Sequence, residues 1–267
     1  MAKKPSKKRE SFRRVYRDEL KRDFKAPSMS EHIVRSFQMM FKNWKLFLPL
    51  GVIGVLILVL TVGVTGFFKE TAGVFEVMVF LVLWLTTIFL VRQIMAKNKV
   101  SLRDGLYNAM TPLISTFVIF AVVVVECIPI FMFIIAYSAA IETGFLAAPF
   151  YALLFWGFAG LMFIISGYLL SSSLISLLAV TVPGVYPFRA LVMATDLMRG
   201  RKMKFVLRLL VLVLVLAVIF AAIILPLSAL KVLPEVISVI IEFLACFGVI
   251  YAATYLYIYY RSLLNNE

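Results

Sequence analysis

Two acidic residues stand inside long apolar runs of this sequence. Glu126 lies in the run 113–137 and Glu242 in the run 236–260. A carboxylate in the hydrocarbon of a bilayer costs about 2.5–3.5 kcal/mol on insertion scales, so it usually faces the interior of a helix bundle. Two roles are open. Glu126 and Glu242 could form a proton or cation relay, or they could be buried acids that bond to hydroxyl groups and fix helix register.

The other reactive residue types argue against familiar catalytic machinery. All Asp residues lie outside the apolar runs, which excludes an intramembrane aspartyl protease. His32 is the only His and lies on the polar side of a predicted surface helix, which excludes HExxH zinc chemistry and Ser–His catalysis. Cys127 and Cys246 lie in apolar runs, so we expect no disulfide framework and no zinc site. We therefore expect no enzyme activity, no catalytic residue, no metal and no cofactor.

A basic cluster lies between the fourth and fifth apolar runs, where Asp196 is the only acid. Its basic residues are Arg189, Arg199, Arg201, Lys202 and Lys204. The turn residues around it are Pro183, Gly184, Pro187 and Gly200. The cluster could hold phospholipid head groups between helices. Alternatively, it only marks a cytoplasmic connection by its positive charge.

Composition tells which elements must position these residues. The chain is 63% hydrophobic and 15% charged, whereas a soluble domain is about half apolar and a quarter charged. Lipid must therefore surround much of it. A helix needs about 20 residues to cross the hydrocarbon core. Six runs reach this length: roughly 46–66, 74–93, 113–137, 148–174, 205–227 and 236–260.

Two of these runs should depart from a straight span. Pro129 lies inside the third run, so we expect a kink there. The fourth run would be too long for the bilayer if it continued to Thr181. We therefore expect its end at Ser171–Ser173 to emerge or bend at the surface.

Basic residues alternate between the connections, which predicts the orientation. Fourteen basic and five acidic residues precede Leu46, and the segments 91–111 and 182–204 are also basic. The remaining connections carry little positive charge. By the positive-inside rule both termini are cytoplasmic. The sequence thus predicts a basic cytoplasmic tail (1–28), a six-span membrane domain (29–262) and a cytoplasmic C-terminus (263–267).

Short amphipathic segments precede each predicted hairpin on the cytoplasmic side. They cover 29–43, 101–111 and 187–199, and we expect them to lie on the membrane surface. Ser101 and Asp104 have the spacing of a capping box. Four tyrosines near Arg261 predict an aromatic belt at the inner end of the last span: Tyr255, Tyr257, Tyr259 and Tyr260.

The third of these units carries a family resemblance. A Pro183–Gly184 turn, the stretch 187–191, the stretch 197–201 and the run from Phe205 follow one another. In this order they resemble the six-span membrane-domain family associated with glycerophosphoryl diester phosphodiesterases and related bacterial integral membrane proteins. The resemblance implies a helical membrane fold over roughly 29–262. It implies no activity here, because the soluble catalytic domain has no counterpart in the sequence.

Together these patterns predict an all-α, six-span integral membrane protein of a bacterial plasma membrane. We expect a non-catalytic role in which it contacts anionic lipid or scaffolds a membrane complex. Its partners would be anionic head groups, a second copy or another membrane protein. The alternative is a small secondary transporter or channel using Glu126 and Glu242. We do not expect nucleic acid as a partner, because acids dilute the basic leader and no RNA-binding motif is present.

Overall fold

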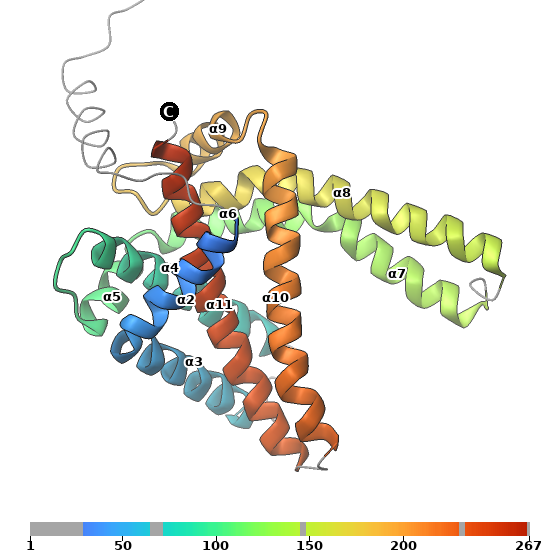
Figure 1. The fold of residues 1–267 in the computed structure, drawn as a ribbon, viewed down its shortest axis with the longest axis horizontal. Coiled ribbons are helices and arrows are strands. Elements are labelled where there is room, and N and C mark those ends of the chain that lie inside the picture. The colour runs from blue at the N-terminus through green and yellow to red at the C-terminus, as the bar shows by residue number, and fades with distance from the viewer. Residues whose placement is uncertain (1–28, 65–71, 145–147, 230–232, 266–267) are drawn as a thin grey trace, which may run out of the picture.

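The computed structural model describes residues 29–64, 72–144, 148–229 and 233–265, and within them it is helical with no strand. The predicted tail, 1–28, lies outside these ranges. Figure 1 shows the arrangement of the helices. Their bounds are α2 (Met29–Lys42), α3 (Trp44–Val64), α4 (Ala72–Met95), α5 (Leu102–Ala109), α6 (Leu113–Glu126), α7 (Ile128–Glu142), α8 (Pro149–Ala179), α9 (Pro187–Leu197), α10 (Lys202–Ala229) and α11 (Pro234–Asn265).

Four helices of the described chain are long and apolar enough to cross a membrane, and six candidates result if two bent pairs count as one span each. The four are α4, α8, α10 and α11. The bent pairs are α2–α3, which meet at 88°, and α5–α6, which meet at 67°. Each pair joins a predicted surface segment to the start of a predicted span. The all-helical character that the sequence predicted is therefore confirmed for the described residues, and four to six helical segments could cross a membrane.

The break in the third predicted run lies at Cys127, next to the expected Pro129. Both Ile130 and Phe131 donate their backbone N–H to the Cys127 carbonyl, at 3.0 and 3.1 Å. Pro129 has no N–H to donate and occupies the first turn of α7, a position that tolerates proline. The apolar helix continues to Glu142, beyond the predicted end at residue 137.

The fourth run contradicts the prediction for its end. Helix α8 runs without interruption to Ala179, and Ser171, Ser172 and Ser173 are buried inside the protein instead of emerging at the surface. The hydroxyl of Ser171 donates to the carbonyl of Tyr168 at 2.7 Å. Such back-bonding satisfies a hydroxyl within its own helix, so serines need not mark a helix end.

Helix α11 is the central element of the fold. It packs against α2, α3, α4, α8 and α10. Two glycines let α3 approach closely: a Cβ at Gly51 would lie 2.5 Å from the Phe247 ring, and one at Gly54 would lie 2.9 Å from Leu83. Small residues at such crossings allow tight helix contact in lipid.

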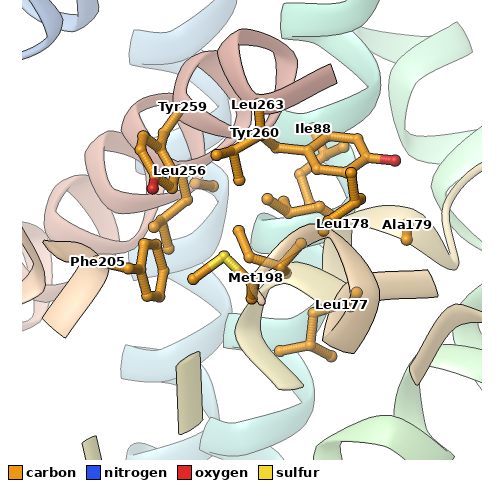
Figure 2. Packing of buried hydrophobic residues seen from close by; sticks show 14 of the residues in the cluster. Ile88, Leu177, Leu178, Ala179, Met198, Phe205, Leu256, Tyr259, Tyr260 and Leu263 are labelled. Carbon is orange, nitrogen blue, oxygen red and sulfur yellow. The ribbon is translucent and has the colours of Figure 1, made fainter. Parts of the chain in front are cut away.

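A hydrophobic core joins the ends of α8, α9, α10 and α11 (Figure 2). The rings of Phe205 and Tyr259 stack with centroids 5.2 Å apart, and Met198 is fully buried in the same cluster. From this junction α7 and α8 extend together, away from α10 and α11 (Figure 1). Most side chains of that hairpin are exposed on the protein surface, including Phe131, Leu153 and Trp156.

Helix α2 buries a residue from the side that the sequence predicted to be polar. His32 is buried, as is Ser36, and Ile33, Phe37 and Met40 pack against the core, while Phe41 and Trp44 are 73% and 54% exposed. The expectation that His32 faces the polar surface was wrong. A related expectation also fails, because Tyr255, Tyr259 and Tyr260 of the predicted aromatic belt are buried in the protein: each is 5% exposed or less.

Candidate functional site

The basic cluster that the sequence singled out lies on α9, in the connection that follows it and in the first turn of α10; we call this whole stretch, 187–204, the α9–α10 turn. Helix α9 begins with Pro187, at the start of the predicted amphipathic segment 187–199, and proline is tolerated in a first helical turn. Gly184 and Gly200 adopt φ of +79° and +73°, which only glycine adopts without strain. Pro183, Gly184 and Gly200 therefore form real turns on either side of α9.

The basic residues of this turn divide into two groups. Arg189, Arg199 and Lys204 are exposed. Arg201 and Lys202 are half-buried, and the Lys202 ammonium lies 4.3 Å from the centre of the Tyr168 ring. A cation over an aromatic face is attracted by the ring quadrupole. Only the first group is free to meet a charged surface.

The exposed side of α9 combines these cations with apolar side chains. Phe188 is 77% exposed and Val192 62% exposed, while Ala190, Ala194 and Leu197 face α6 and α8. Aromatic and aliphatic side chains next to arginine on one helix face are typical of helices that lie on a membrane.

Glu126 has a hydroxyl partner. Its Oε1 accepts a hydrogen bond of 2.8 Å from Ser173 of α8, and its backbone carbonyl accepts one of 3.0 Å from Ser166. Lys202 of α10 is the cation that acts on it. The two serine hydrogen bonds join α6 to α8, which is the kind of contact that the register-fixing interpretation of this acid predicts.

Glu242 lies in different surroundings. The groups within its electrostatic range are Glu76 of α4 and Cys246 on its own helix. Glu126 and Glu242 thus have no neighbour in common among these interactions. The relay between them stays a prediction that needs a functional test.

A polar cavity of about 340 Å³, which the sequence did not suggest, lies at the end of α4. Arg92 donates to the carbonyl of Thr181 there, at 3.3 Å, and so ties α4 to the segment after α8. The polar lining of the cavity comes from Arg92, Gln93, Asn108, Thr111, Ser115 and Thr181. The hydrogen bond from Arg92 to Thr181 holds the Pro183–Gly184 turn against α4.

A second group of charges and rings, which we call the α2–α10–α11 cluster, was also missed. It consists of His32 on α2, Arg208 on α10, and Tyr255 and Tyr259 on α11. The His32 ring lies 6.2 Å from the Tyr255 ring and 6.0 Å from the Tyr259 ring. The Arg208 guanidinium lies over Tyr259, 4.8 Å from its centre. The sequence offered one indication, since Arg208 stands inside a predicted span.

An apolar groove of about 450 Å³ lies farther along the same three helices, and its lining residue Tyr251 is one turn from Tyr255 on α11. It lies between α2, α3, α10 and α11, and it is open to the outside. Its lining is almost entirely hydrocarbon and aromatic and includes Phe37, Trp44, Leu216, Phe220, Phe247 and Tyr251. The Tyr251 hydroxyl closes one side by donating to the Ile33 carbonyl at 3.4 Å.

Neither metal chemistry nor a known relative adds a further site. Within the described ranges, no three His, Cys, Asp or Glu side chains are grouped so that they could hold a metal ion. The chain matches no protein-family model, no curated protein and no solved structure.

Proposed function

We propose that this chain is a non-catalytic, polytopic protein of a bacterial plasma membrane that binds anionic lipid head groups at its cytoplasmic face. The observation that carries this proposal is the exposed side of the α9–α10 turn. Arg189, Arg199 and Lys204 are exposed in this stretch, and so are Phe188 and Val192. Each cation near an anionic leaflet contributes about 1 kcal/mol to attraction, and the apolar side chains can enter the interface.

The proposed topology has six spans and cytoplasmic termini. The spans would be α3, α4, the α6–α7 pair, α8, α10 and α11, with α2, α5 and α9 on the cytoplasmic surface. The sharp bends between α2 and α3 and between α5 and α6 support this layout, since a surface helix must turn to enter the bilayer. The capping box at Ser101 supports a separate start for α5: the Ser101 hydroxyl accepts from the Asp104 N–H at 3.2 Å.

The resemblance to the membrane domains associated with glycerophosphoryl diester phosphodiesterases is kept as part of the proposal, for fold alone. The turn residues that carry it have a clear structural role, because Gly184 and Gly200 both need positive φ. None of these residues supplies chemistry for a phosphodiester reaction.

A scaffolding role is supported by the α7–α8 hairpin. This hairpin extends away from the rest of the molecule and exposes large apolar side chains along its length (Figure 1). Lipid or another membrane helix can cover such a surface, so a second copy or another membrane protein is a fitting partner. If two copies meet through this hairpin, a Leu153→Cys variant should form a disulfide-linked dimer. Absence of that dimer at every protein density in the membrane would contradict a homo-oligomer joined at this surface.

Lipid preference in bilayers tests the main proposal. The triple variant Arg189→Gln, Arg199→Gln, Lys204→Gln and the native chain are reconstituted into nanodiscs, and association with spin-labelled phosphatidylglycerol and phosphatidylcholine is compared. We expect the native preference for phosphatidylglycerol to fall by up to roughly fivefold per removed charge at low salt. Arg103→Gln on α5, an exposed cation outside this stretch, measures the loss that follows from removing one surface charge, and the triple variant should lose more. An unchanged preference in the triple variant would overturn the proposal.

A further inference from the structure

We propose that the chain holds one anionic phospholipid in a site of its own, with the phosphate at the α2–α10–α11 cluster and an acyl chain in the adjoining apolar groove. The inference deepens the proposed function, on which it rests for the position of this face in a membrane. The site differs from the α9–α10 turn because it is partly enclosed and takes a whole lipid molecule.

The polar end of the site contains buried groups that have no partner within the described residues. His32 and Tyr255 are each only 1% exposed, yet the His32 Nδ1 and the Tyr255 hydroxyl make no hydrogen bond there. The same holds for one terminal nitrogen of Arg208 and for the Arg261 Nε. A buried polar group without a hydrogen bond costs about 1–3 kcal/mol. A phosphate, which offers several acceptor oxygens, satisfies such donors together.

The charge at this end favours an anion. Arg208 and Arg35 both act on His32, and Arg261 acts on Arg35, whereas Glu31 is the acid that acts on His32. Arginine binds phosphate through a planar pair of donors, which makes it the usual residue for this ligand. Outside bulk water, such attraction is stronger than at an exposed surface.

Helix geometry connects the polar end with the groove. On α11, Tyr255 lies one turn beyond Tyr251, which lines the groove. On α10, Arg208 lies two turns before Leu216, a separation of about 12 Å along the axis. On α2, His32 lies just over one turn before Phe37, whose ring packs against Tyr251 with centroids 4.4 Å apart. Cations stand at one end of the site and hydrocarbon at the other.

This pairing selects the occupant. Free phosphate would leave the groove empty. An uncharged hydrocarbon would leave the Arg208 nitrogen without a hydrogen-bond acceptor. An apolar helix of another protein would bring no anion to His32 and Tyr255. An amphiphile with a phosphate and an acyl chain meets both ends at once, and an anionic phospholipid has this chemistry.

Native mass spectrometry of the full chain tests the site. Native protein, Arg208→Gln, Leu216→Trp and the control Arg103→Gln are reconstituted with equal amounts of phosphatidylglycerol and phosphatidylcholine, then released from detergent. We expect the native chain and Arg103→Gln to keep one phosphatidylglycerol. Occupancy should fall about tenfold or more in Arg208→Gln, which loses a charged hydrogen bond, and similarly in Leu216→Trp, which fills the groove.

Equal retention of phosphatidylglycerol in both variants and the native chain would overturn the site. So would thermal stabilisation of the delipidated chain by millimolar inorganic phosphate as large as that given by phosphatidylglycerol, because the groove would then add nothing. If Arg208→Gln fails to fold, as judged by circular dichroism and gel filtration, the test rests on whether Leu216→Trp lowers the retention of phosphatidylglycerol.

The two proposals can fail separately. Suppose that Arg208→Gln loses the bound lipid while the triple variant at the α9–α10 turn keeps its lipid preference. That result would support this site and refute the proposed surface contact. If instead Arg208→Gln keeps the bound lipid and the triple variant loses its preference, this site is refuted and the surface contact is supported.

Discussion

His32 is the residue whose environment departs most from what its sequence position suggested. Burial, and next the nearby charge of Arg208, lower its pKa from 6.5 to about 4; Arg35 acts in the same direction and Glu31 opposes them. The rings of Tyr255 and Tyr259 face it from α11. The His32 imidazole is therefore neutral in the native state at neutral pH, and it lies on a helix that precedes the first proposed span.

Acidification should destabilise the delipidated chain through this residue. Between pH 6.5 and about 4 the unfolded chain binds a proton at His32 and the native chain does not, so the free energy of unfolding falls as the pH is lowered. Thermal unfolding in detergent between pH 6.5 and 5, above the usual range of carboxylates, measures this slope. His32→Gln should flatten it, because the chain has no other His. An equal slope in both proteins would contradict the prediction.

The hydrogen-bond partner of Glu126 favours a structural role for this acid over a proton relay. Its bond to Ser173 is the hydroxyl contact expected of an acid that fixes helix register. We therefore expect liposomes containing the chain to show no proton flux driven by a pH gradient, and Glu126→Gln with Glu242→Gln to behave like the native chain. A pH-sensitive dye trapped inside the liposomes measures the flux. Flux in the native chain that disappears in the double variant would instead support the transporter.

At the scale of the elements, the glycine turns offer a clean test of backbone strain. Gly200 has φ of +73° with nothing within 4 Å of an added Cβ, so Gly200→Ala changes only backbone strain. We expect it to lower the free energy of unfolding by about 1 kcal/mol. Gly157 in α8 also has open space around it, but its φ is helical.

The matched variant Gly157→Ala should leave stability unchanged or raise it, since alanine favours helix. Equilibrium unfolding of both variants in mixed micelles gives the comparison. If Gly200→Ala proved as stable as Gly157→Ala, the turn between α9 and α10 would not need its left-handed residue.

Helix positions were largely predictable, because the properties that set them are local. Apolar runs, the first-turn Pro187 and the capping box at Ser101 act within a few residues, and α5 and α9 begin where these features predicted. The end of α8 was not predictable in this way. Whether Ser171–Ser173 meet water or the inside of the protein depends on α6 and α9, which lie against α8 in space.

At the scale of the whole molecule, the proposed topology places the connections around residues 98 and 199 on the same side of the membrane. Asn98→Cys and Arg199→Cys should both react with an impermeant maleimide only from the cytoplasmic side, and Gly144→Cys only from the outer side. All three positions are exposed. The native cysteines, buried Cys246 and half-buried Cys127, give the background level of maleimide labelling. Opposite accessibility of positions 98 and 199 would refute the layout.

The three-dimensional arrangement was beyond the sequence for a physical reason. Hydrophobic patterning tells lipid from water, but within lipid nearly every side of a helix is apolar, so the pattern does not say which side meets a neighbour. The residues that decide this are small or polar: Gly51 and Gly54 against α11 and α4, Ser173 toward Glu126, and His32 toward α11. Their partners lie far along the chain, and the α2–α10–α11 cluster was missed for that reason.

The central position of α11 has a consequence for assembly during synthesis. Helices α2, α3 and α4 pack more extensively against α11 than against any other helix, yet all three are translated before it. At about 5–20 residues per second, the final stretch of some thirty residues takes a few seconds to follow. During that interval the sides of α2, α3 and α4 that later contact α11 have no partner from this chain, whereas α8 can already pack against α6, α7 and α9.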